Sequence, residues 1–248
     1  MFSKENYGIV NGIDKTNPRF VQGKEVSVIY DDGRHYIRTL PKDARFDVIT
    51  TDPIDPRVKG SAALNTIEYY EMCKRHLKPG GVMSLWMPLY ESNLASAKSM
   101  IATFFQVFPN GLIFSNDAQF EGYDAVLLGQ AEPSAINVDN LRKLLGQENY
   151  AQVRSFLLEV GFGSDNAWVG SFNQDVATSL LATFAGRASS MSDWTHNAQI
   201  NRDSNLRLQY LAGMYFNSYL STTILQNILS HYTFPQDLFV GSGQNIMN

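Results

Sequence analysis

Two aspartates three residues apart have the clearest capacity for chemistry in this sequence. Asp52 and Asp55 lie in the segment FDVITTDPIDP, directly after the apolar run Phe46–Thr51. A carboxylate that follows a buried strand is desolvated on one side, so it can accept a proton from an amine or hold a cationic group. Open parallel α/β sheets bind their ligands at this end of their strands. The pair therefore predicts a small-molecule site, and the alternative is a rigid loop, because Asp-Pro pairs are common turn formers.

A second acidic turn follows the alternating segment Glu25–Tyr30, where the sequence is Asp31-Asp32-Gly33. Glycine permits close approach of a ligand to the backbone, and the acid before it can accept a hydrogen bond from an adenine amino group or a ribose hydroxyl. The alternative is an ordinary turn between a strand and a short helix.

Strands and helices alternate in the part of the chain that would position these residues. Alternating or apolar runs predict strands, and apolar residues at helical spacing predict helices. We expect strands at 25–30, 46–51, 82–87, 112–115 and 124–128, and helices at 35–40, 92–108 and after the N-cap Asn65. This order predicts an α/β protein with a mostly parallel sheet, in which the last two strands form an antiparallel hairpin. Strand 46–51 is apolar enough to be buried on both faces.

The character of the sequence changes after Ala131-Glu132-Pro133. The segments that follow have helical patterns and contain no strand candidate of comparable strength: 137–146, 150–160, 172–184 and 204–230. We therefore predict two parts, an α/β domain over residues 1–132 and an all-helical C-terminal extension over residues 133–248.

The composition excludes several classes of function. The net charge of −4 provides no basic surface for nucleic acid. The single cysteine, Cys73, excludes an internal disulfide, and the four histidines fall at no metal-ligand spacing. No apolar run is long enough to cross a membrane, so we expect a cytoplasmic chain with no membrane segment. From these observations together we also expect no metal site, and a small molecule as the partner.

Three segments together resemble the spermidine synthase (polyamine aminopropyltransferase) family over roughly residues 20–130: EVSVIYDDGRHYI, FDVITTDPIDP and HLKPGGV. The resemblance implies a Rossmann-like sheet of the S-adenosylmethionine-methyltransferase type, with strand order 3-2-1-4-5-7-6. We expect this sheet to be partial and to lack its first two strands. The helical remainder is similar to a C-terminal extension of larger bacterial spermidine synthase-like proteins, some of which have a membrane-embedded N-terminal half.

The resemblance also implies an activity. In the family, decarboxylated S-adenosylmethionine, a co-substrate and not a permanently bound cofactor, donates an aminopropyl group to putrescine. By position, Asp52 would be the base that helps to deprotonate the amine, Asp55 would hold the diamine, and Asp32 and Gly33 would contact the adenine. The family's glycine-rich nucleotide loop and ribose-binding acid precede the strand at 25–30. We therefore expect the C-terminal part of a longer or split enzyme, inactive or weak alone and completed by an N-terminal segment or a second copy.

Two other functions remain open from the sequence. A methyltransferase-like enzyme could use the same fold with S-adenosylmethionine, although two carboxylates suit a polyamine better than a methyl acceptor. A non-catalytic domain could serve as a binding or assembly module through its helical extension. If two strands are missing, we expect Glu25–Tyr30 to pair directly with Phe46–Thr51, because an apolar strand with an open edge is an aggregation hazard.

Overall fold

The structure is a computed structural model that describes residues 20–21, 24–25, 29–53, 55–115, 122–163, 175–214 and 219–242. The chain divides into two compact units, Met1–Leu40 and Pro41–Asn248, which we describe separately. In the first unit, β1 (Phe20–Val21) and β2 (Lys24–Glu25) form an antiparallel pair, and α1 spans Gly33–Thr39.

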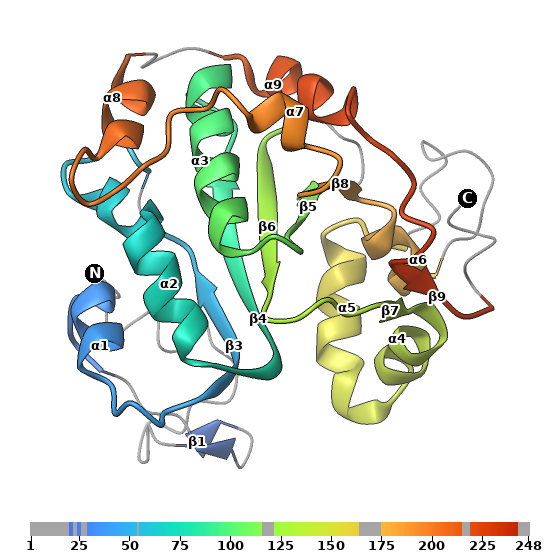
Figure 1. Cartoon of the computed structure of the whole chain (residues 1–248). Coiled ribbons are helices and arrows are strands. Elements are labelled where there is room, and N and C mark those ends of the chain that lie inside the picture. Colours follow the sequence, from blue (N-terminus) through green and yellow to red (C-terminus); the bar gives the residue numbers. More distant parts are fainter. Residues whose placement is uncertain are drawn as a thin grey trace. The chain divides into compact units, whose positions relative to one another are not determined.

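The second unit contains the remaining elements (Figure 1). Its strands are β3 (Phe46–Thr51), β4 (Leu77–Pro88), β5 (Leu112–Ser115), β6 (Asp124–Gln130), β7 (Ile136–Asn137), β8 (Phe184–Arg187) and β9 (Phe239–Val240). Its α-helices are α2 (Ile67–Arg75), α3 (Leu94–Val107), α4 (Val138–Leu145), α5 (Ala151–Glu159), α6 (Val176–Leu181), α7 (Ser192–Thr195), α8 (Arg207–Gly213) and α9 (Ser221–Leu229). Two 3₁₀ helices, η2 (Ser61–Asn65) and η3 (Glu148–Tyr150), complete the set among the described residues.

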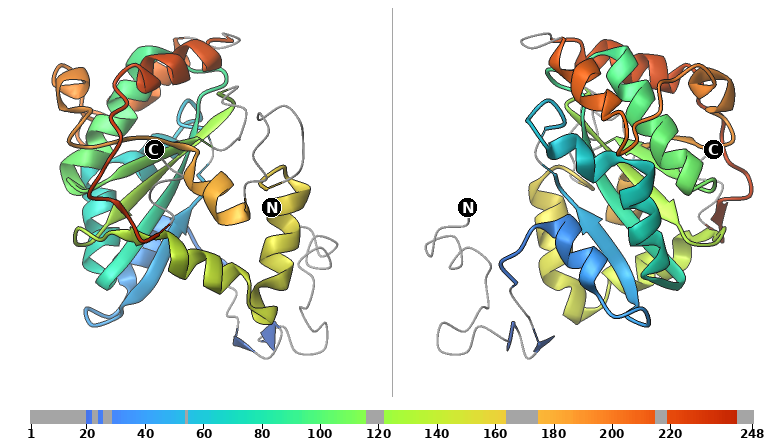
Figure 2. Two further views of the ribbon diagram at one scale, coloured as in Figure 1. Left: turned by 90° about the vertical axis from the view of Figure 1, so that its right-hand side faces the viewer. Right: turned by 60° about the vertical axis from the view of Figure 1, so that its left-hand side comes forward.

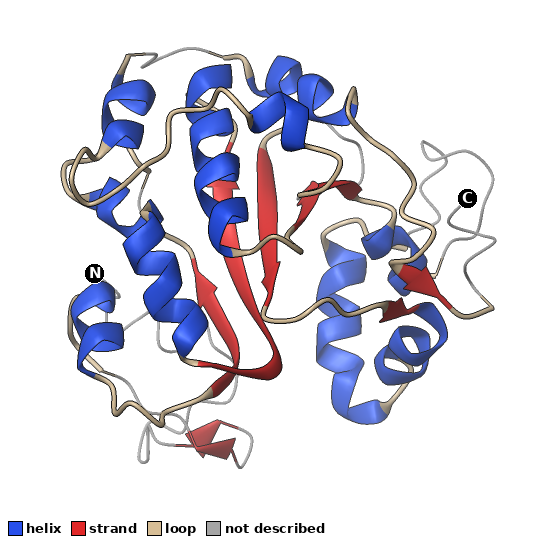
Figure 3. Cartoon of the chain, viewed as in Figure 1, coloured by secondary structure: helices blue, strands red, loops and turns tan. Residues whose placement is uncertain are grey.

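A five-stranded mixed sheet in the order β3-β4-β6-β5-β8 forms the centre of this unit (Figure 3). β3 and β4 are parallel, and the other three neighbouring pairs are antiparallel. The α/β class is confirmed, and so is the hairpin, in which β5 pairs with β6. The described sheet is mixed and not mostly parallel, because β6 runs antiparallel to both of its neighbours and β8 runs antiparallel to β5. The order β3-β4-β6-β5 matches the 4-5-7-6 half of the expected methyltransferase-type order.

Helices α2 and α3 cover one face of the sheet, and α4 to α6 lie on its other side (Figure 2). Tyr70 from α2 and Phe104 from α3 are fully buried beneath this cover and meet edge to face, with ring centroids 5.1 Å apart. Gly129 of β6 leaves room for the ring of Phe108, because an added Cβ would lie 2.5 Å from that ring. Aromatic packing of this kind holds α3 against the sheet.

Strand β3 is less buried than its sequence predicts. Val48 on this strand is 56% exposed, and within the described residues β3 pairs with β4 alone. The prediction of burial on both faces is therefore wrong, because apolar composition does not reveal whether a helix covers the second face. The predicted pairing of Glu25–Tyr30 with β3 stays a prediction, since residues 26–28 lie outside the described residues.

The C-terminal part adds a strand to the sheet, so the prediction that it is all helical is wrong. β8 pairs with β5 in antiparallel register, Leu112 opposite Arg187. β8 is only four residues long and has no β-branched side chain, so its strand state comes from pairing with the sheet edge. The division at residues 132 and 133 stays a prediction.

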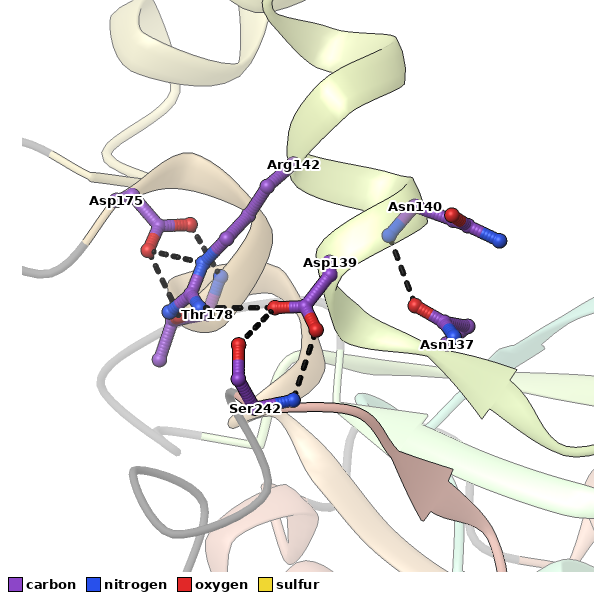
Figure 4. A network of polar contacts seen from close by, with 7 residues as sticks. All are labelled: Asn137, Asp139, Asn140, Arg142, Asp175, Thr178 and Ser242. Atoms are coloured by element: carbon purple, nitrogen blue, oxygen red, sulfur yellow. Dashed lines mark hydrogen bonds and ion pairs between the residues drawn. The ribbon is translucent and has the colours of Figure 1, made fainter.

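A second core and a polar network join the C-terminal helices to this sheet. Phe184 of β8 packs with Val138, Leu181 and Phe239 in one buried cluster. Beside it, Figure 4 shows Arg142 of α4 between the carboxylates of Asp139 and Asp175, with Ser242 bonded to Asp139. These contacts fix α4, α6 and the segment after β9 to one another.

Candidate functional site

The carboxyl ends of β3 and β4 lie together because the two strands are parallel, with Thr51 opposite Leu85. The loops that leave these ends carry Asp52 and Asp55 from β3 and residues 89–93 from β4. Asp124, at the start of the antiparallel strand β6, lies opposite Pro88 at the same edge. The sheet therefore gathers acidic residues from three strands at one end.

Asp52 is exposed and makes no hydrogen bond or ion pair with any of the described residues. The residue after it, Pro53, is buried, so the backbone of the loop is held against the sheet while the carboxylate faces outward. Such a carboxylate is accessible to a ligand and can accept hydrogen bonds from it through both oxygens.

Asp55 has the opposite environment. Its side chain is 15% exposed, and its Oδ1 accepts a hydrogen bond of 2.9 Å from the backbone nitrogen of Arg57. The guanidinium Nε of Arg57 lies 3.7 Å from Oδ2, which is within ion-pair distance but too long for a hydrogen bond. Oδ2 therefore keeps an acceptor position for a further donor.

Arg57 links Asp55 to the next loop through an ion pair with Glu91. The side chains of Arg57 and Glu91 are 22% and 23% exposed, so this contact is largely shielded from water. Glu91 has a φ of 46°, a left-handed conformation that is uncommon for a residue other than glycine. The loop after β4 thus adopts a costly backbone conformation beside this ion pair.

Aromatic rings lie beside the acidic residues at this end of the sheet. Tyr90 stacks on Tyr123 with ring centroids 4.6 Å apart, and Trp86 lies 6.1 Å from Tyr90. The backbone nitrogen of Tyr90 donates to the carbonyl of Tyr123, which ties the loop after β4 to the start of β6. Burial raises the pKa of the Tyr90 hydroxyl, and Tyr123 and the charges of Asp124 and Asp55 raise it further, so this group stays protonated at neutral pH.

The C-terminal part of the chain also contributes residues to the candidate site. Asn93 accepts a hydrogen bond from Ser96 as the N-cap of α3, and its Nδ2 donates to the carbonyl of Leu211 in α8 at 2.8 Å. Ala212, the next residue of α8, borders a recess of about 10 Å³ that Asp55 and Glu91 also line. The recess is too small to hold a small molecule as it stands.

Asp32 and Gly33 lie in the N-terminal unit. Asp32 is the N-cap of α1, and its Oδ1 accepts a hydrogen bond of 2.8 Å from the backbone nitrogen of His35. An added Cβ at Gly33 would meet no atom within 4 Å, so nothing in this unit requires glycine there. This geometry matches the alternative of a turn between a strand and a helix, and adenine binding stays a prediction.

Sequence reasoning missed four residues of this region: Arg57, Tyr90, Glu91 and Asp124. Arg57 could have been noticed as a cation two residues after Asp55 in the same loop. Glu91 comes from a different loop, and no local pattern indicates that it meets Arg57.

No group of three or more histidine, cysteine, aspartate or glutamate side chains with metal-binding geometry occurs in the described part of the chain. Among the same residues, no helix combines the length and the apolar character that a bilayer crossing requires.

Comparison with known proteins finds a family model and a solved structure to which this chain is similar. Residues 9–114 match the family model of the spermine/spermidine synthase domain. A solved structure, that of a probable spermidine synthase from Corynebacterium glutamicum, is similar to this chain with a TM-score of 0.44 and 20% sequence identity. The similarity covers 76% of this chain and 57% of that one, so this chain spans a little over half the length of that relative.

Proposed function

We propose that the chain takes part in aminopropyl transfer, because residues 9–114 match the family model of the spermine/spermidine synthase domain. The donor is decarboxylated S-adenosylmethionine, and the acceptor is putrescine or a similar amine. The lone pair of the amine nitrogen forms an N–C bond to the carbon beside the sulfonium. The C–S bond breaks, its electrons leave a neutral thioether, and the extra proton on nitrogen passes to a base.

One observation carries the assignment of roles. Asp52 and Asp55 follow the same strand, yet Asp52 is exposed without a described partner while Asp55 is mostly buried and held by Arg57. An open carboxylate suits proton acceptance, and a fixed one suits orientation of a cation by a charge-assisted hydrogen bond. We assign Asp52 as the base and Asp55 Oδ2 as the amine-binding atom.

The aromatic rings support a cationic substrate. Tyr90 and Tyr123 stack beside the acidic residues, and Tyr123 is 62% exposed. A ring face within about 6 Å attracts an ammonium group. In this proposal the amine lies between the Tyr123 ring and Asp55. When no amine is bound, the positive charge of Arg57 offsets the electrostatic repulsion between the carboxylates of Asp55 and Glu91.

The contact of Asp32 and Gly33 with the adenine of the donor is also part of this proposal. Oδ1 of Asp32 is used as the helix cap, and Oδ2 makes no hydrogen bond with the described residues, so it is available to an adenine amino group. We also propose that the protein acts in the cytoplasm, because its single cysteine, Cys73, is buried and forms no disulfide.

The experiment that tests this function uses the full-length protein that carries this sequence. It is incubated with putrescine and either decarboxylated S-adenosylmethionine or S-adenosylmethionine, and the products are separated by chromatography. Spermidine formed from the decarboxylated donor supports the proposal. Methylated amine formed from S-adenosylmethionine would replace it with methyl transfer, and no product from either donor would favour the non-catalytic module.

A further inference from the structure

A larger pocket lies at the opposite end of the sheet from Asp52. Gln130 at the end of β6 pairs with Val82 near the start of β4, and Arg187 at the end of β8 pairs with Leu112 at the start of β5. These residues border a cavity of about 460 Å³, which falls within the size range of small-molecule sites. Neither the family resemblance nor the proposed function uses this pocket.

Backbone hydrogen bonds hold the walls of this pocket. The nitrogen of Gly111 donates to the carbonyl of Phe108 at 2.9 Å, and the nitrogen of Ala188 donates to the carbonyl of Gly111 at 2.9 Å. On the other side, Ile136 donates to the carbonyl of Leu238 at 2.6 Å. The pocket is therefore formed before any ligand binds, which lowers the entropic cost of binding.

Gln130 presents an acceptor at this pocket. The residue is only 7% exposed, and its Nε2 donates to the carbonyl of Ser134 at 3.0 Å. No described residue donates to its Oε1. A buried amide of which one half is bonded and the other half borders a cavity is suited to receive a donor from a ligand.

Arg187 presents donors at the same pocket. Its Nη1 donates to both carboxylate oxygens of Asp237, at 2.7 and 3.0 Å, and its Nε and Nη2 make no hydrogen bond with the described residues. The planar guanidinium therefore keeps one edge that matches the two oxygens of an oxyanion. The hydrogen bond from Arg187 lowers the pKa of Asp237, so Asp237 stays ionised and can attract a cationic group.

We propose that this pocket binds a small metabolite that carries an oxyanion at one end and an ammonium at the other. The free edge of Arg187 binds the oxyanion, a carboxylate or a phosphate. Asp237 and Oε1 of Gln130 bind the ammonium, while Leu112 and Leu238 contact the carbon chain. A ligand with both charges fits this pocket best, because Asp237 would repel a ligand that is only an anion and Arg187 would repel a ligand that is only a cation.

The test is a titration of ¹⁵N-labelled full-length protein with three probes, followed through its amide spectrum. The probes are β-alanine, 2-aminoethyl phosphate and propylamine, which differ in the group at one end of a short amine. We expect saturable shifts at the amides of Gly111 and Ala188 with β-alanine or 2-aminoethyl phosphate, with propylamine at least tenfold weaker. The tighter of the two oxyanion probes identifies carboxylate or phosphate as the group recognised.

Three variants make the assignment specific. Arg187→Gln and Gln130→Leu should each weaken the binding of the better probe about tenfold. Lys143→Gln, which removes one charge from α4 outside the pocket, should leave the binding unchanged. Gln130→Leu leaves the Arg187–Asp237 pair intact and serves as the test if Arg187→Gln fails to fold.

Three results would overturn the proposal. They are the absence of saturable shifts with both oxyanion probes, equal binding of propylamine, and unchanged binding in folded Arg187→Gln or Gln130→Leu protein. None of these results bears on aminopropyl transfer, which depends on the other end of the sheet.

Discussion

Replacing Asn201 by alanine tests whether the C-terminal segment is built into the wall of the candidate site. The Asn201 side chain is fully buried and makes three hydrogen bonds to backbone groups. Its Nδ2 donates to the carbonyls of Ala62 at 2.8 Å and Asn65 at 2.9 Å, and its Oδ1 accepts from the nitrogen of Leu208 at 3.0 Å. Alanine removes all three of these bonds from the interior.

The expected loss follows from these contacts. At about 1–1.5 kcal/mol for each hydrogen bond, Asn201→Ala should lower the free energy of unfolding by about 3–5 kcal/mol. The measurement is urea unfolding followed by tryptophan fluorescence. The matched control is Asn197→Ala, at an exposed residue with no described side-chain hydrogen bond, which should change the free energy by no more than about 0.5 kcal/mol.

The outcome shows whether residues 197–213 are loosely attached or are an integral part of the site. A loss of less than about 1 kcal/mol in Asn201→Ala would refute the reasoning, because it would mean that this segment is loosely attached. A loss in the expected range would show that α8, which follows Asn201 and borders the recess at Asp55, is an integral part of the site.

Two further predictions concern other parts of the second unit. Gly129→Ala should lower the free energy of unfolding by about 1–3 kcal/mol, because its Cβ would lie 2.5 Å from the ring of Phe108. The control Gly213→Ala, whose Cβ would meet no atom within 4 Å, should not lower it. Urea unfolding of both variants measures the difference. Burial raises the pKa of Asp175, but hydrogen bonds from Thr178 and Arg142 outweigh it and lower the pKa below 3.8. The stabilisation by Asp175 is therefore present above pH 3.8 and lost below it, so the melting-temperature gap to Asp175→Asn should narrow from pH 7 to pH 3; a constant gap would contradict this.

Local patterns were sufficient to predict much of the sheet. The boundaries of β3 and β5 and the β5–β6 hairpin agree with the prediction, because each is a short apolar run bounded by polar or turn residues. Helix α3 also agrees to within about two residues at its ends, since its apolar residues keep a helical period over its whole length.

Tertiary contacts decided the elements that the sequence did not predict. Asn65 and Thr66 are both good N-cap residues, and the prediction of Asn65 as the cap of α2 is wrong. Thr66 accepts the capping bond from Tyr69, while Asn65 is buried and accepts a hydrogen bond from the hydroxyl of Tyr70. Asn201, from a distant part of the sequence, also donates to the carbonyl of Asn65, so the choice between the two caps depends on packing that no local pattern contains.

The candidate site was predictable only in part. Strand periodicity placed Asp52 and Asp55 at the carboxyl end of β3, where the structure has them. The different exposure of the two carboxylates was not predictable, because it depends on Arg57 and on Glu91 from another loop. Long-range ion pairs between short loops leave no periodic signal in a single sequence.

The central claim is that Asp52 accepts the proton and Asp55 holds the amine. The most direct test is steady-state kinetics of the full-length protein with decarboxylated S-adenosylmethionine and putrescine. Asp52→Asn should lower kcat about 10²–10⁴-fold with little change in the KM for the donor. Asp55→Asn should mainly raise the KM for the amine, about tenfold or more.

The matched control for these kinetics is Asp47→Asn, which removes a carboxylate from the other end of the same strand, where it pairs with Lys78. Its kcat and both KM values should stay near those of the wild type. A folded Asp52→Asn protein with near-normal kcat would contradict the assignment of Asp52 as the base. Loss of kcat in Asp52→Asn, with Asp47→Asn unaffected, is the result that the account predicts.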